Sequence, residues 1–120
     1  MNLRVAIAQI APVLLDRTAT TGKIVERITE AGREGAGLVC FGETLLPGYP
    51  VWICRTDGAR FDDDDQKSLF ARYSREAVSI EAGDLDPIRK AARDANITVI
   101  LGIVERPALR GGHSLYCSCL

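Results

Sequence analysis

The feature that most constrains the fold is a pair of short apolar runs separated by one amphipathic helical pattern. Residues 4–10 are almost continuously apolar, and residues 38–41 form a second apolar run. Between them, residues 16–34 place apolar side chains at helical spacing after a plausible capping aspartate, and Gly35 follows. This order predicts a βαβ unit with two parallel strands, and the continuous first run is typical of a strand buried on both faces.

The second half of the chain continues the alternation of helices and strands. Residues 42–65 are rich in Pro, Gly and Asp and predict a long loop. Helical patterns follow over residues 66–78 and 87–95, and for the second of these we expect Asp86 as the cap with Pro87 in the first turn.

The final third of the chain predicts two more strands. Residues 97–104 are rich in β-branched residues and predict one central strand. Gly111-Gly112 predicts a tight reversal into an antiparallel strand over residues 114–120. The expected fold is therefore a single α/β domain over residues 1–120 with the order βαβααββ.

Length, charge and hydropathy exclude several classes of function. The chain has 120 residues and a net charge of −1, so it lacks the positive charge that nucleic-acid binding requires. No apolar run approaches the roughly 20 residues of a membrane helix, and no signal-peptide core of about 7 to 15 residues is present. We therefore expect no nucleic-acid partner, no membrane partner and a cytoplasmic location, where the four cysteines stay unpaired.

Glu43 is the most promising chemical group because it lies two residues beyond the second predicted strand. In open α/β sheets, ligands bind outside the carboxyl ends of the strands. A carboxylate flanked by Phe41 and Leu45 would be partly desolvated, which favours a role as a general base. The alternative is a solvated or ion-paired loop glutamate, and position alone does not decide between the two.

The sequence around Glu43 resembles a known family over essentially the whole chain. Residues 5–12 read VAIAQIAP, and residues 41–50 read FGETLLPGYP. Further matching segments are AAR at 91–93, LGIVER at 101–106 and SLY at 114–116. Together they resemble the nitrilase branch of the carbon-nitrogen hydrolases.

This resemblance implies a fold, a chemistry and a role for one residue. The family folds as an α-β-β-α sandwich and hydrolyses nitriles or amides, without a cofactor, by means of a cysteine, a lysine and a glutamate. By motif match, Glu43 is that glutamate. The resemblance covers an N-terminal portion, and we expect the chain to end before the family's lysine and nucleophilic cysteine. Complete family domains are expected to form homo-oligomers.

Three residues after the Pro-Gly turn are candidates for substrate contacts. Tyr49 and Trp52 can form an apolar wall for an organic substrate, although packing of the loop onto the sheet explains them equally well. Cys54 matches no nucleophile motif of the family, and we interpret it as a bystander lining the pocket. Cys117, Cys119 and His113 are close in sequence but lack the spacing of a metal site, so no metal is assigned.

A non-catalytic interpretation stays open beside the enzymatic one. The chain can persist as a truncated α/β piece that self-associates, or it can bind a full-length relative through the open edge of its sheet. A small nucleotide-binding module is a weaker third option, because no glycine-rich loop follows any predicted strand.

Overall fold

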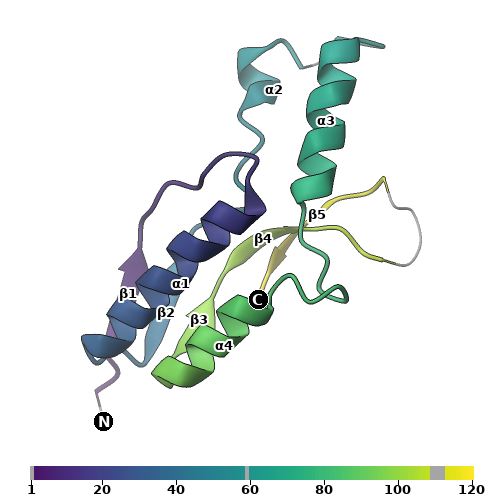
Figure 1. Cartoon of the computed structure of the whole chain (residues 1–120). Coiled ribbons are helices and arrows are strands. Elements are labelled where there is room, and N and C mark those ends of the chain that lie inside the picture. The colour runs from purple at the N-terminus through teal and green to yellow at the C-terminus, as the bar shows by residue number, and fades with distance from the viewer. Residues whose placement is uncertain (1, 59, 109–112) are drawn as a thin grey trace.

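A computed structural model describes residues 2–58, 60–108 and 113–120 and contains two small β-sheets with helices around them (Figure 1). The first sheet is parallel and has the strand order β1-β2-β3, and the second is an antiparallel pair, β4-β5. The strands are β1 (Val5–Ala8), β2 (Leu38–Phe41), β3 (Thr98–Ile100), β4 (Gly102–Glu105) and β5 (Tyr116–Cys119). The helices are α1 (Arg17–Arg33), α2 (Trp52–Arg55), α3 (Asp64–Glu76) and α4 (Asp86–Ala95).

Helix α1 begins and ends where the residue pattern predicts. The Asp16 carboxylate accepts a hydrogen bond from the backbone N–H of Ala19 at 2.8 Å, which satisfies one of the free donors of the first turn. After the helix, Gly35 has a φ of 79°, a left-handed conformation that glycine adopts without steric penalty. The face that carries Ile24 and Ile28 is completely buried against the parallel sheet.

The parallel pairing of β1 with β2 is confirmed, but the prediction that β1 is buried on both faces is wrong. Ala6 and Ala8 pack against the main core, whereas Ile7, on the opposite face of the strand, is 83% exposed. Both α1 and α4 cover the same face of the sheet (Figure 1), so the described residues leave the other face open.

The predicted strand over residues 97–104 is in fact two strands, and neither is central. β3 lies at the edge of the parallel sheet, where it pairs with β2. At Leu101 the chain leaves this sheet, because the Leu101 N–H and C=O both pair with Leu120 at 3.1 and 3.0 Å. β4 then pairs with β5 in the predicted antiparallel direction. The reversal predicted at Gly111-Gly112 lies outside the described residues.

Helical boundaries in the middle of the chain also differ from the prediction. The loop over residues 42–65 contains the short helix α2, and α3 begins before residue 66 because the Asp63 carboxylate caps it through the N–H of Gln66 at 3.0 Å. Leu85, not Asp86, is the N-cap of α4, and Asp86 lies inside the first turn. Because of α2 and the divided strand, the observed order differs from βαβααββ.

A second, smaller apolar cluster lies beside the main core. Its buried members are Trp52, Tyr73, Ala77 and Val104, which come from α2, the end of α3 and β4. The rings of Trp52 and Tyr73 meet edge to face, with centroids 4.7 Å apart. In Figure 1, α2 and α3 stand together at one end of the molecule.

Among the described residues, no helix is long and apolar enough to cross a bilayer.

Candidate active site

The backbone around Glu43 is held by a close approach to Gly102. A Cβ atom added at Gly102 would lie 2.6 Å from the Glu43 Cα and 2.6 Å from the Gly42 carbonyl oxygen, so only glycine fits. Beyond Glu43, the Leu46 N–H donates to the Gly102 carbonyl at 3.4 Å, and the Val104 N–H donates to the Leu46 carbonyl at 2.9 Å. These contacts fix the Glu43 backbone beside the start of β4.

Thr44, the residue after Glu43, carries a strained backbone and an unpaired hydroxyl. Its φ is 49°, a left-handed conformation that is unfavourable for a β-branched residue. The residue is 5% exposed, and Thr44 Oγ1 has no hydrogen-bond partner among the described residues. Strain of this kind concentrates at functional positions, where the surrounding structure enforces it. Residue patterns carry no signal for it, since threonine is common in ordinary strands.

The Glu43 carboxylate contacts one side chain that sequence reasoning did not select. Cys117 on β5 donates a hydrogen bond from Sγ to Glu43 Oε1 at 3.5 Å. Glu43 itself is exposed, so the expected partial desolvation is wrong for the described residues. The reason is local: Leu45 and Leu46 bury their side chains in the core, while the Glu43 side chain lies outside it.

The electrostatics of this region favour neutral thiol and phenol groups. Partial desolvation, the hydrogen bond to Glu43 and the negative charges of Glu43 and Cys119 raise the pKa of the Cys117 thiol above its ordinary value. Burial raises the pKa of Tyr73 to about 12, and the negative charges of ionised Cys117 and Tyr49 add to this effect. The Tyr73 hydroxyl donates to the Gly48 carbonyl at 2.9 Å, which ties α3 to the loop after Glu43.

The three predicted substrate-contacting residues have different surroundings. Tyr49 is 58% exposed, and the negative charge of its ionised form helps to raise the pKa of Tyr73 in the small apolar cluster. Trp52 is only 8% exposed, because its ring packs on Tyr73. Cys54 is exposed on α2, and among the described residues no hydrogen bond joins it to Glu43. Tyr49 and Trp52 are therefore both neighbours of Tyr73, whereas Cys54 lies apart from Glu43 in hydrogen bonding.

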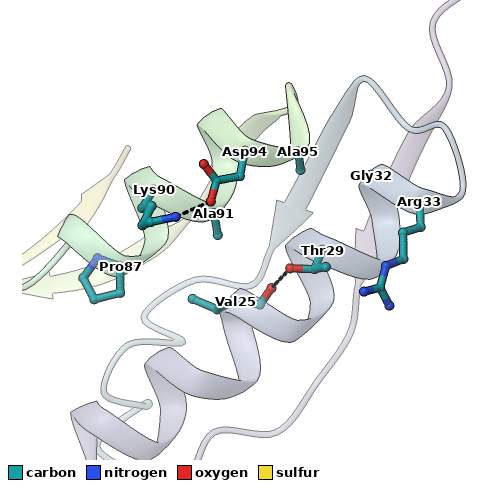
Figure 2. Close-up of a pocket in the computed structure, with 9 residues that line it drawn as sticks. All are labelled: Val25, Thr29, Gly32, Arg33, Pro87, Lys90, Ala91, Asp94 and Ala95. Carbon is teal, nitrogen blue, oxygen red and sulfur yellow. Dashed lines mark hydrogen bonds and ion pairs between the residues drawn. The ribbon is translucent and has the colours of Figure 1, made fainter.

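The groove between α1 and α4 offers little reactive chemistry. It has a volume of about 660 Å³, and Figure 2 shows its polar side chains partly paired with one another. Lys90 forms an ion pair with Asp94, and the Thr29 hydroxyl donates to the Val25 carbonyl at 2.9 Å. Glu43 is not among its lining residues. Across the described ranges, no group of three or more His, Cys, Asp or Glu side chains is arranged to hold a metal ion.

Comparison with known proteins identifies the family of the chain. Residues 4–120 match the carbon-nitrogen hydrolase family. The chain belongs to this family. It is 39% identical over 121 residues to a nitrilase 2 from an unknown prokaryotic organism, an alignment that covers 99% of this chain and 36% of that protein. It is also 40% identical over 116 residues to an arylacetonitrilase from Aspergillus niger, covering 96% of this chain and 31% of that protein.

A solved structure shows the same fold. An amidase from Nesterenkonia sp. superposes with a TM-score of 0.52 at 22% identity, covering 85% of this chain and 32% of that chain. This likeness confirms the predicted α/β architecture. The carbon-nitrogen hydrolase chain described here therefore spans about a third of the length of the relatives it matches.

Proposed function

We propose that this chain is part of a nitrile-hydrolysing enzyme in which Glu43 is the general base. The observation that carries the proposal is the family match over residues 4–120, combined with a Glu43 backbone fixed beside Gly102 at the end of β2. A base must be held at a constant place relative to the nucleophile, and this close backbone approach supports that requirement.

The proposed reaction converts a nitrile and two waters into a carboxylic acid and ammonia. Glu43 accepts the proton of an attacking thiol as the sulfur bonds to the nitrile carbon. One C–N π bond breaks and the proton passes to the nitrogen, which gives a thioimidate. Addition of one water and loss of ammonia give a thioester, and a second water, activated by Glu43, releases the acid and the thiol. By family resemblance the thiol and a stabilising lysine come from positions that no residue of this sequence matches.

We further propose that the substrate is an organic nitrile or amide with an apolar, aromatic group. The relatives named arylacetonitrilases support this choice, and so does the exposed ring of Tyr49 close to the Glu43 loop. In this proposal Tyr49 forms the accessible part of the wall, and Trp52 and Cys54 contribute to it from α2. No cofactor takes part in the proposed steps.

The test is a chimaera that joins residues 1–120 to the remaining part of the Aspergillus niger arylacetonitrilase. Ammonia released from phenylacetonitrile measures activity. We expect Glu43→Gln to lower kcat by about 10²–10⁴-fold, the range typical of a lost general base. Glu30→Gln, on the exposed face of α1, is the matched control and should retain full activity. A Glu43→Gln chimaera as active as its parent would remove the proposal.

A second candidate is a non-catalytic role in association, favoured by the open face of the parallel sheet. Val5, Ile7 and Ile100 all expose apolar side chains on this face. In this alternative the 120-residue chain self-associates or binds a longer relative through its sheet. Size-exclusion chromatography tests it: a monomer that binds no apolar-surface dye at micromolar concentration contradicts the alternative.

We also propose that the complete enzyme is a homo-oligomer in the cytoplasm. Family resemblance supports the oligomer. All four cysteines, Cys40, Cys54, Cys117 and Cys119, are free, which is in keeping with a reducing compartment. Light scattering of the chimaera and fractionation of expressing cells test the two statements separately.

A further inference from the structure

The Glu43 side chain has one described polar contact, and it comes from a distant part of the chain. Cys117 is 74 positions further along, yet its Sγ lies 3.5 Å from Glu43 Oε1. The antiparallel register makes this possible, because Cys117 pairs with Val104 and Cys119 pairs with Gly102. The thiol thus projects from β5 toward the loop that Gly102 holds against β4.

The direction of this hydrogen bond follows from the charges that face the thiol. Glu43 in the loop, Cys119 on β5 and Tyr73 on α3 are the acidic groups near it, together with Tyr49 beside Tyr73. No positively charged group of the described residues contributes to the shift, and the pKa of Cys117 is raised above its ordinary value. The thiol is therefore protonated at neutral pH and donates the hydrogen bond, and Glu43 Oε1 accepts it.

We propose that Cys117 is a positioning residue that orients the Glu43 carboxylate for proton transfer. The inference rests on the proposed function of Glu43 as a base. A glutamate side chain has three rotatable bonds, and an exposed one samples many rotamers even where its backbone is fixed. The bond to Cys117 holds Oε1 toward β5 and leaves Oε2 free for the reaction. The protonated state of the thiol also argues against a nucleophilic role for Cys117 itself.

The first test follows the carboxylate directly in the 120-residue chain. With glutamate labelled with ¹³C at the side-chain carboxyl, we expect Cys117→Ala to shift the Glu43 carboxyl resonance, and Cys117→Ser, which keeps a donor, to restore it in part or in full. Cys119→Ala removes a thiol from the same face of β5 and serves as the matched control. A Glu43 resonance that is the same in Cys117→Ala as in the parent chain overturns the proposal.

The second test measures the same contact from the thiol. Alkylation by iodoacetamide, followed at Cys117 by peptide mass spectrometry, reports the thiolate fraction at each pH. We expect Glu43→Gln to move the midpoint for Cys117 to lower pH and to speed its alkylation at pH 8 by roughly three- to tenfold. Glu105→Gln is the matched control, because Glu105 bonds to Ser118 on the other face of the strand pair. An unchanged midpoint in Glu43→Gln contradicts the proposal.

Activity of the chimaera separates this inference from the proposed function. We expect Cys117→Ala to lower kcat by about three- to tenfold with little change in KM, and Cys117→Ser to recover most of the loss. If Glu43→Gln is inactive while Cys117→Ala equals the parent, only the positioning role fails. If Glu43→Gln is fully active, the proposed function fails, whatever the resonance and alkylation measurements show about the contact.

Discussion

The parallel-sheet core and the Glu43 region are built by different means. In the core, Ile24 and Ile28 on α1 pack with Val39 on β2, and all three side chains are almost completely buried. Around Glu43, in contrast, the structure depends on backbone meeting backbone at Gly102 and on a left-handed Thr44. Packing of side chains therefore stabilises the core, whereas the lack of a side chain at Gly102 allows the backbone contact that holds Glu43.

This difference indicates where stability and chemistry reside in the chain. In the core, an exchange that keeps the side-chain volume is tolerated, whereas a truncation leaves a cavity that the neighbours fill only in part. A backbone contact has no such freedom, so it holds one residue at one place at the expense of local strain. The two regions should consequently respond differently to substitution.

The largest effect is expected in the core. Ile28→Ala removes a side chain that is fully buried between α1 and the sheet, and we expect it to lower the free energy of unfolding by about 4 kcal/mol. Urea denaturation followed by circular dichroism measures it. Ile28→Val, which deletes one methylene, should lose only about 1 kcal/mol. Equal losses in the two variants would contradict a closely packed core at this position.

A slightly smaller loss, with a different signature, is expected at Gly102. An added methyl group would meet the backbone of Glu43 and Gly42 at 2.6 Å, so Gly102→Ala should destabilise the fold by about 3 kcal/mol. It should also shift the Glu43 carboxyl resonance, which Ile28→Ala should leave in place.

Gly22 in α1 provides the matched control for this glycine substitution. Nothing lies within 4 Å of a Cβ added there, so Gly22→Ala should stabilise the helix by about 1 kcal/mol. If Gly102→Ala proves as harmless as Gly22→Ala, the close approach that holds Glu43 is absent in solution.

The third effect is a loss of stability at high pH that comes from Tyr73 in the small apolar cluster. The folded state raises the pKa of Tyr73 from 10.0 to about 12, mainly by burial, so the unfolded chain loses this proton first. Stability from Tyr73 is thus complete below pH 10 and declines by about 2 kcal/mol as the pH rises to 12. Denaturation at several pH values measures the decline. Tyr73→Phe should flatten it, and a decline of equal size in that variant would assign the effect to other groups.

Local patterns were sufficient to predict the core but not its open side. The spacing of Ile24 and Ile28 predicts both a helix and its buried face, and Asp16 marks its start, so α1 and its place beside the parallel strands follow from the sequence. Burial of Ile7 could not be judged in the same way. A continuous apolar run indicates only that both faces of a strand can be buried. Whether a second layer covers each face depends on other parts of the molecule.

Prediction of the site was limited to the residue carried by a motif. Glu43 was selected by its place after β2 and by the family resemblance, and its role remains a proposal. Its contact with Cys117 depends on the register of β4 with β5, which is a non-local property that no short pattern encodes. Gly102 was likewise hidden inside an apolar run that predicted one continuous strand, although a lone glycine in such a run is a known sign of close backbone approach.

The bridge between Leu46 and Ile103 makes the segment after Glu43 behave differently from an ordinary loop. Its amide at Leu46 and the amide at Val104 are both engaged across the chain, so their protons should exchange with deuterated solvent as slowly as those inside the neighbouring ladder. The backbone that follows Glu43 should then detach only when the pairing around β4 also opens, although the Glu43 side chain itself is exposed.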